Sequence, residues 1–318
     1  MARTAKGQEA MNMNHDMLPA QSKPRSKSRG IGGALLAAIV TLALTSASVE
    51  AQTKQDGKQA KQNKQNTKLS KWPALKKAAS DRARATAQQF KKPQEELQTE
   101  AHGKLVAMGA GVAPVIIALV SDRAHNTNEH LFAVLDAVVN KSHASLLARE
   151  AKRPSVEWRR YLLRKLAGFH DADMAAVFKP ALKDKDPDIT IYAGLGLLSL
   201  GKHDGLDIVL LAAKQRWTEF GDITSKVLPA ARSSACSLPI FEKIAAARAT
   251  DQMAGLRLLR YLMIKDQGML LRTYLNSSDF AVKKEAINTA RVLNGEKPLD
   301  KLSSFQAIDQ AKKWLLKI

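Results

Sequence analysis

The chain has 318 residues, of which 45% are apolar but only 5% aromatic, as in helical proteins rich in alanine and leucine. Its formal net charge is +20, which favours anionic partners such as an acidic protein, nucleic acid or membrane head groups. Cys236 is the single cysteine, which excludes an intramolecular disulfide, and its apolar neighbours predict a small buried side chain.

Residues 1–51 have the pattern of an export signal. Four basic residues between positions 23 and 29 precede an uncharged apolar run over residues 31–49. Small residues follow, and cleavage after Ala51 would leave Gln52 as the first mature residue. Because about 20 apolar residues can span a bilayer, an uncleaved single-span membrane anchor is the alternative. The lysines from Lys54 onward oppose translocation and argue against both, but we expect an exported protein, periplasmic, extracellular or membrane-anchored.

Residues 52–80 predict a disordered tether. The segment holds eight lysines against one aspartate and has almost nothing to bury. It could bind an anionic surface electrostatically, or it could be a solvated spacer before the folded domain. Trp72 is its single aromatic residue, and the lack of aromatic side chains for stacking on bases favours the spacer.

Residues 81–318 repeat one helical hairpin. The clearest copy predicts helices over Asp188–Leu200 and Gly205–Gln215, separated by a short turn after Gly201. The first of these helices is apolar almost all round, so it needs neighbours on several sides. Further hairpins before and after it supply them. An apolar anchor opens the first helix of each unit, about every 31 residues. The anchors are Leu97, Leu131, Trp158, Ile191, Ile223, Ala254 and Val282.

Capping residues and turn residues agree with this repeat. Short polar residues lie three positions before four anchors, where they can cap the first turn of a helix: Ser155, Asp188, Asp251 and Asp279. Glycines fall at the turns within hairpins: Gly109, Gly168, Gly201, Gly268 and Gly295. Pro114 and Pro239 fit the first turn of second helices, whereas Pro229 should kink a first helix. The last second helix is expected to bury Phe305, Ile308 and Leu315. No alternating apolar pattern predicts a strand.

The stretch from Asp279 to Gly295 resembles a unit of the HEAT-repeat proteins, which are armadillo-type α-solenoids. It has an aspartate cap, the β-branched anchor Val282, a basic residue at Lys283, spaced alanine and leucine, and a glycine turn. Residues 105–122 resemble the turn and second helix of that family. Two units depart from the pattern, because Tyr192 replaces the basic residue and the unit at Ile223 lacks a clear cap. The resemblance implies an all-α, right-handed superhelix of about seven hairpins over residues 81–318. It also implies that the second helices line a concave face, which in this family usually binds other macromolecules.

No motif for catalysis fits. The run Asp184-Lys-Asp186-Pro-Asp188 looks like the start of a calcium loop, but Ile189 and Leu195 stand where glycine and glutamate are required. The run Gly194-Leu-Gly196 lies inside a predicted helix and follows no strand, so it is not a dinucleotide loop. His170 and His203 are expected in solvated turns. We therefore predict no enzymatic activity, no cofactor and no metal site.

Basic residues are the remaining functional candidates. Stacked hairpins would align a positive stripe along the concave face, made of Lys179, Lys183, Lys214, Lys243, Arg248, Arg272 and Lys312. The alternative is that these side chains only solvate exposed helix faces. First helices carry further arginines at Arg159, Arg160, Arg164, Arg257 and Arg260.

The sequence thus predicts a non-enzymatic, protein-binding or scaffolding α-solenoid. Its partner would be another protein, and an acidic one if the stripe is functional. One alternative is a HEAT-like protein that binds a polyanion or nucleic acid, although export argues against a DNA substrate. The other is an accessory, lyase-like enzyme component, since a HEAT-like family serves chromophore attachment; the lack of a visible nucleophile weakens it.

Overall fold

The computed structural model describes residues 69–318, and all regular structure within this range is helical. The apolar run 31–49, the cleavage position after Ala51 and residues 52–68 of the predicted tether lie outside the described residues. The first half contains α2 (Lys77–Ala87), α3 (Glu95–Ala107), α4 (Ala113–Leu119), α5 (His125–Val138), α6 (Ala144–Arg149), α7 (Val156–Ala167), α8 (Ala175–Ala181) and α9 (Pro187–Leu198). The second half contains α10 (Leu206–Gln215), α11 (Trp217–Val227), α12 (Ser234–Ile244), α13 (Ala249–Leu262), α14 (Arg272–Leu275), α15 (Phe280–Leu293) and α16 (Ser304–Leu315).

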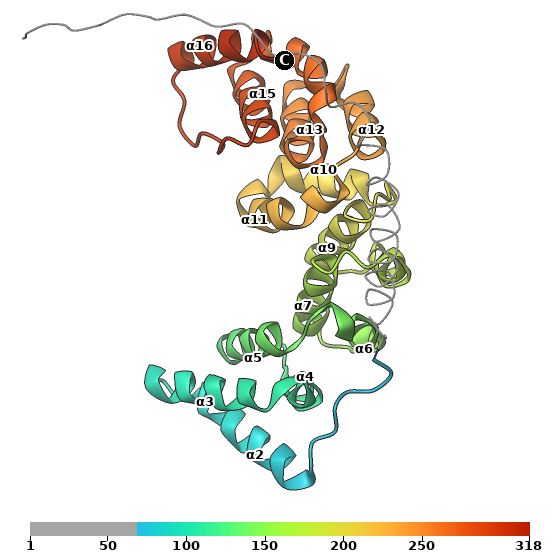
Figure 1. Ribbon diagram of the computed structural model, residues 1–318, viewed down its shortest axis with the longest axis vertical. Coiled ribbons are helices and arrows are strands. Elements are labelled where there is room, and N and C mark those ends of the chain that lie inside the picture. Colours follow the sequence, from blue (N-terminus) through green and yellow to red (C-terminus); the bar gives the residue numbers. More distant parts are fainter. Residues whose placement is uncertain (1–68) are drawn as a thin grey trace, which may run out of the picture. The chain divides into compact units, whose positions relative to one another are not determined.

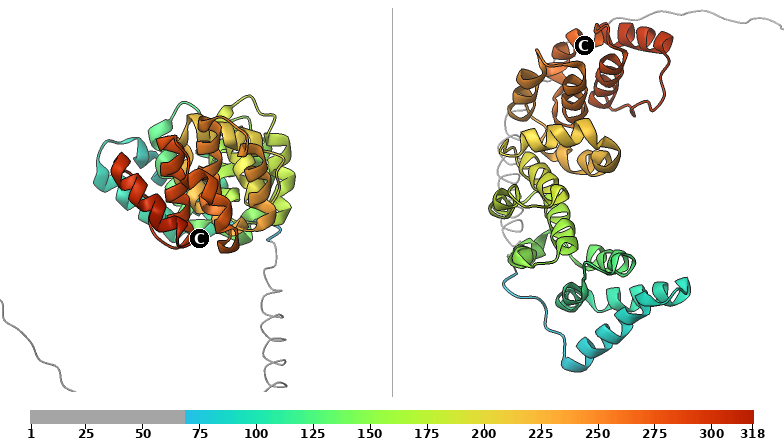
Figure 2. Two further views of the ribbon diagram at one scale, coloured as in Figure 1. Left: turned by 90° about the horizontal axis from the view of Figure 1, so that it is seen from above. Right: turned by 180° about the vertical axis from the view of Figure 1, so that it is seen from behind.

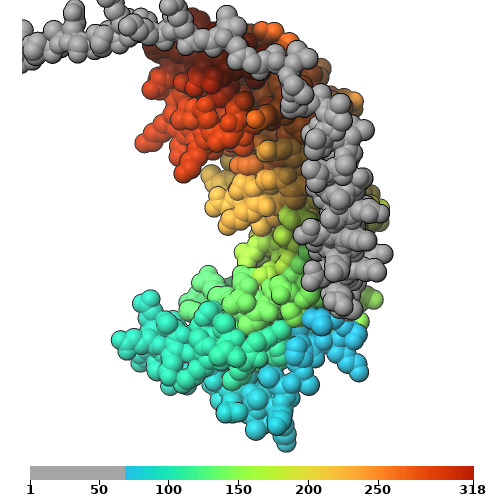
Figure 3. Space-filling view, in the orientation of Figure 1, coloured from blue at the N-terminus to red at the C-terminus, as the bar shows by residue number. Residues whose placement is uncertain are grey.

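Helices that follow one another along the chain also pack on one another. The most extensive contacts join α7 to α9 and α13 to α15, and α10 packs on both α9 and α13. The labels of Figure 1 succeed one another from α2 to α16, and the views in Figure 2 show the same succession of colours. On the face drawn in Figure 3, the surfaces of these helices also follow one another from blue to red.

Helix α9 belongs to two hydrophobic clusters. Ile189, Ala193 and Leu197 pack with residues from α2 to α8, whereas Ile191, Leu195 and Leu198 pack with residues of the second half. All six side chains are at most 5% exposed. The prediction that this apolar helix needs neighbours on several sides is therefore confirmed.

Glycines in and beside α9 let its neighbours approach closely. A Cβ atom on Gly205 would lie 2.5 Å from the Cα of Gly194, and one on Gly196 would lie 2.5 Å from the ring of Phe178. Those separations are closer than real Cβ contacts, so a side chain at position 205 would require a backbone shift, and one at position 196 would require the Phe178 ring to move. The run Gly194-Leu-Gly196 thus has a packing role between α8, α9 and α10.

The helix starts confirm two of the four predicted caps. Ser155 accepts a hydrogen bond from the amide of Trp158, and Asp279 accepts bonds from the amides of Ala281 and Val282. The prediction was wrong at Asp188, because Pro187 begins α9 and Asp186 is its cap. It was also wrong at Asp251, which lies in the first turn of a helix that starts at Ala249.

Glycine and proline positions were predicted in part. Gly109, Gly201 and Gly295 adopt the left-handed conformation expected at a turn, with φ between 65° and 80°. At the turn after α7, His170 rather than Gly168 takes positive φ, and Gly268 lies within a 3₁₀ segment, Lys265–Leu271. Pro114 lies in the first turn of α4, and the α-helix before Pro229 ends at Val227. Pro239 is inside α12, because that helix already starts at Ser234.

Helix α16 buries a different face from the one expected. Ala307, Ala311 and Trp314 are buried, whereas Phe305 is 74% and Ile308 46% exposed. The prediction was therefore wrong at Phe305 and Ile308, whereas Leu315 is half-buried and packs against the cluster of the second half.

The described part begins before the boundary expected at Asp81. Helix α2 starts at Lys77, and Trp72 and Leu75 pack against the first hydrophobic cluster. The Trp72 ring stacks on His143 with 5.5 Å between centroids. Within residues 69–318 no single helix has both the length and the apolar character to cross a membrane, although two sharply bent helix pairs reach those values together.

Candidate functional site

The seven residues of the predicted basic stripe lie on or beside six different helices. Lys179 lies in α8, Lys183 follows it, Lys214 lies in α10, Lys243 in α12, Arg248 directly before α13, Arg272 in α14 and Lys312 in α16. The structure brings Lys214, Lys243 and Arg248 together and leaves the others apart.

The gathered cations are balanced by aspartates. Lys214 lies 2.6 Å from Asp251, Lys243 lies 2.7 Å from Asp207, and Arg248 lies 4.0 Å from Asp251. A hollow of about 340 Å³ between α10, α12 and α13 is lined by the four paired residues Asp207, Lys214, Lys243 and Asp251. This hollow is therefore crossed by ion pairs.

The other four residues have different surroundings. Lys179 lies 3.5 Å from Asp204, and Arg272 donates a hydrogen bond of 3.1 Å to the carbonyl of Leu315. Lys183 and Lys312 are exposed and form no ion pair with the residues that the structure describes. Most of the predicted stripe is thus neutralised or occupied within the protein.

A second surface is formed by the first helices α5, α7, α9 and α11. Two adjoining hollows, of about 410 and 620 Å³, share Asp136, Arg164 and Tyr192 in their linings. The first extends over α5 and α7 towards Glu157, and the second extends over α11 towards Lys226. We call the two together the first-helix surface.

Contacts between neighbours hold the aromatic side chains of this surface. Phe132 and Tyr161 stack with 4.3 Å between ring centroids. The Tyr161 hydroxyl donates to Asp136 over 3.0 Å, and Lys165 donates to the same carboxylate over 2.7 Å. Burial and the charge of Asp136 raise the pKa of Tyr161 well above its ordinary value, so this phenol stays a neutral donor.

Arg164 is an unpaired cation of the first-helix surface, as is Lys226 at its far end, among the residues that the structure describes. Its guanidinium carbon lies 5.8 Å from the centre of the Tyr161 ring, within cation–π range. The side chain is exposed and forms no ion pair within residues 69–318. Tyr192, which lines the same two hollows, is half-buried, and burial raises its pKa. A rigid aromatic group and an uncompensated charge therefore lie side by side.

Three aspartates before and within α9 pair with arginines of neighbouring helices. Asp184 pairs with Arg159 at 3.2 Å, Asp186 with Arg160 at 2.6 Å, and Asp188 with Arg216 at 2.7 Å. Burial opposes the charge of Asp186, but hydrogen bonds from Arg160 and from the amides of Ile189 and Asp188 outweigh it and lower its pKa. The residues that resembled a calcium loop thus bind arginines of α7 and an arginine beside α11.

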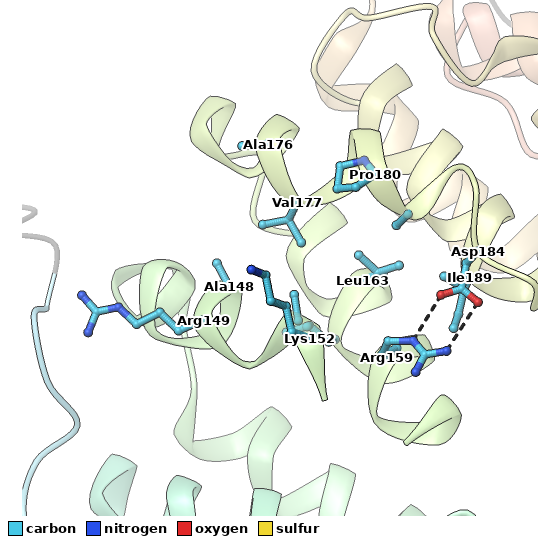
Figure 4. Close-up of a pocket in the computed structure, with 13 residues that line it drawn as sticks. Ala148, Arg149, Lys152, Arg159, Leu163, Ala176, Val177, Pro180, Asp184 and Ile189 are labelled. Carbon is cyan, nitrogen blue, oxygen red and sulfur yellow. Dashed lines mark hydrogen bonds and ion pairs between the residues drawn. The ribbon is translucent and has the colours of Figure 1, made fainter. Parts of the chain in front are cut away.

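A third surface is an apolar groove between α6 and α8, which Figure 4 shows at close range. Leu162 and Leu163 of α7 and Ile189 of α9 form its floor, and its volume is about 580 Å³. The walls are mostly small side chains: Ala148, Ala151, Ala176, Val177, Pro180 and Ala181. Arg149, Lys152 and the Arg159–Asp184 pair form its rim. We call this the α6–α8 groove.

The single cysteine is buried, and the metal-binding side chains of the described residues lie apart. Cys236 is 3% exposed, as its apolar neighbours predicted, so its thiol is shielded from solvent. Among the described residues no three side chains of the metal-binding types come close enough to hold an ion. The first-helix surface was missed at the sequence level, although its arginines were noted, because periodicity does not show which exposed residues meet across helices.

Comparisons with known proteins leave the family open. No protein-family model matches the chain, and no curated protein matches it.

Proposed function

We propose that the chain is a non-enzymatic, protein-binding scaffold, exported or associated with the cell envelope. Its HEAT-like hairpins would form an α-solenoid with the right-handed superhelix that the family resemblance implies. The packing of helices on others close in sequence, such as α7 on α9 and α13 on α15, supports this arrangement, as does the sharing of α9 between two clusters. Because each hairpin contacts mainly the next, such a chain exposes long helical faces to a partner.

The observation that carries the proposal is the first-helix surface. Interface residues that contribute most to binding are enriched in tyrosine, tryptophan and arginine. Tyr192 and Arg164 supply these groups at the junction of two hollows. The buried Tyr161 ring lies beneath Arg164, and stacking with Phe132 and the bond to Asp136 fix that ring in place, so this support for Arg164 is already ordered before a partner binds.

Charges on this surface define the partner's chemistry. Exposed Arg164 would pair with a carboxylate of the partner. Exposed Glu129 and Asp222 form no ion pair in the described part of the chain and would pair with a lysine or arginine of the partner. A folded protein surface presents both signs at fixed positions, whereas a polyanion presents only one. Ion pairing within the predicted basic stripe also leaves fewer cations for a polyanion. Protein binding is therefore the better-supported function.

Site-specific photocrosslinking in the source cells tests the proposal. The full chain would carry p-benzoylphenylalanine in place of Arg164, with the same group in place of Lys243 as the matched control. We expect a discrete protein adduct at position 164 and none at position 243, where ion pairs cross the hollow. With the partner identified, Arg164→Glu should weaken its binding about 30-fold, the effect of losing about 2 kcal/mol at a central arginine. No adduct at position 164, or the same adducts at both positions, would contradict the proposal.

A further inference from the structure

The α6–α8 groove has the size and lining of a ligand pocket. Its volume of about 580 Å³ lies within the range of about 300–1,000 Å³ that is usual for small-molecule sites. Most of its lining is aliphatic: leucine and isoleucine on the floor, and alanine, valine and proline on the walls. A ligand that fills it must therefore be apolar over most of its length.

The volume of the groove limits what can fill it. Leu162 and Ile189 are fully buried and Leu163 is 3% exposed, so a ligand would contact mainly the small wall side chains that cover them. Two turns of an α-helix with its side chains would fill roughly 1,000 Å³, which is more than the groove's volume of about 580 Å³. A single alkyl chain is much thinner than a helix and fits between the alanine-lined walls. The limited volume thus favours an extended chain over a partner helix.

Cationic groups occupy the rim. Lys152 is exposed and forms no ion pair or hydrogen bond with the described residues, and Figure 4 shows its ammonium group over the groove, between α6 and Val177. Arg149 lies further along the same wall, where it donates to the carbonyl of Ser70 over 2.8 Å. Asp184, the one acidic residue of the lining, is compensated by Arg159. An anionic head group therefore fits at Lys152.

We infer that the α6–α8 groove binds a long-chain fatty acid. The alkyl chain lies over Leu162, Leu163 and Ile189, and the carboxylate pairs with Lys152. Apolar burial supplies most of the affinity, so two additional methylenes that fit the groove tighten binding about tenfold. The partly exposed ion pair supplies orientation and about a fivefold gain. This site is separate from the first-helix surface and does not depend on protein binding there.

Calorimetric titration of the full chain with dodecanoate, below its micelle concentration, tests the inference. Wild type should bind dodecanoate tightly, dodecanol about fivefold more weakly and dodecyltrimethylammonium more weakly still. Lys152→Met should weaken dodecanoate about fivefold and leave dodecanol unchanged, which isolates the charge pair. Lys243→Met is the matched control and should change neither. Because all variants carry the same lysine-rich tether, differences between them report on the groove.

A second variant tests the location of the ligand. Ala176 is exposed on the α8 wall, so Ala176→Trp should fill the groove without disturbing the core and weaken dodecanoate at least tenfold. Leu211→Trp, at a side chain 53% exposed beside the α10–α12 hollow, should have no effect. Equal binding to wild type and Ala176→Trp, or no binding to wild type, would overturn the inference. So would tight binding of an acidic amphipathic peptide in place of dodecanoate. Crosslinking at position 164 should be the same in Ala176→Trp, so the two proposals fail separately.

Discussion

Two hollows between neighbouring second helices have opposite electrostatic arrangements. Between α10 and α12, Lys214 and Lys243 each pair with an aspartate across the opening. Between α6 and α8, Lys152 has no such partner, and the one acidic residue of the lining is already bound to Arg159. The same kind of interhelical space is thus closed by ion pairs in one region and left open, apolar and cationic in the other.

The helices from α5 to α9, here the first region, and those from α10 to α15, here the second region, also differ in where their strongest charge pairs lie. Near α13 and α15, Glu285 is 8% exposed and pairs with both Arg257 and Arg260. Near α7 and α9, Arg160 and the aspartates of the α9 start are only partly buried. The second region therefore uses charge to join its helices internally. The first keeps charge near solvent, where a ligand or partner can reach it.

The largest effect is expected at the buried pair of the second region. Glu285→Ala should lower the free energy of unfolding by about 3–5 kcal/mol, because it leaves Arg260, which is 6% exposed, without its carboxylate. Urea denaturation followed by circular dichroism measures the change. The control replaces Glu285 and Arg260 together by methionine, which removes both charges and should recover most of the loss. Equal destabilisation by both variants would contradict this account.

A smaller effect is expected at the half-exposed pair of the first region. Asp186→Ala should cost about 1–2 kcal/mol, because Asp186 caps α9 through the amides of Asp188 and Ile189 and also binds Arg160. Asp204→Ala removes only an exposed partner of Lys179 and should cost less than about 0.5 kcal/mol. The same urea titration compares the two. A loss at Asp204 that matched the loss at Asp186 would exclude the capping explanation.

Acidification should lower the stability of the first region more than that of the second, because no histidine follows His203. Burial lowers the pKa of His143, despite its contact with the backbone of Asn140, and burial together with the nearby Lys141 charge lowers the pKa of His170. Both folded pKa values lie below the ordinary value of about 6.5, so the unfolded chain binds more protons and stability falls as pH drops below 6.5. The lowered pKa values of Asp122 and Asp186 act only below about pH 4.

Urea titrations at pH 7 and pH 5 check this prediction. The double variant His143→Gln, His170→Gln should show a smaller loss between these pH values than wild type. Limited proteolysis at pH 5 should cut the segment from α5 to α8 before the segment from α12 to α15. An identical pH dependence of wild type and variant would show that other groups control it.

Sequence periodicity predicted the helices and most of their buried faces. Trp158, Leu162 and Leu166 recur on one face and are all buried, as are Val282, Ala286 and Ala290. Such faces follow from local spacing alone. Boundaries depend on competition between neighbours, and there the predictions at Asp188 and Asp251 were wrong, since Pro187 begins α9 and α13 already begins at Ala249.

The sites were much less predictable than the fold. The basic residues were visible, but their partners are distant in sequence: Lys214 meets Asp251, and Lys243 meets Asp207. Arg164 and Tyr192 meet only because α7 and α9 pack together. A count of lysines therefore overestimated the free positive charge. The α6–α8 groove was not predicted, because its walls are mostly alanine and valine positions that periodicity assigns to an ordinary helix face.

The smallest effect is expected from a double variant that leaves the lysines of the α10–α12 hollow unpaired, as Lys152 is in the α6–α8 groove. Asp207→Ala together with Asp251→Ala removes both partners of Lys214 and Lys243 and should cost less than about 1 kcal/mol for each partly exposed pair. The freed ammonium groups then lie over Leu210 and Leu211, as Lys152 lies over the α6–α8 groove. We expect a second, weaker dodecanoate site in the calorimetric titration, which Leu211→Trp removes. Because the α10–α12 hollow is smaller, at about 340 Å³, it should accept a shorter part of the chain and prefer octanoate to dodecanoate relative to the α6–α8 groove. A double variant that binds dodecanoate no better than wild type would show that volume, rather than free charge, distinguishes the two hollows.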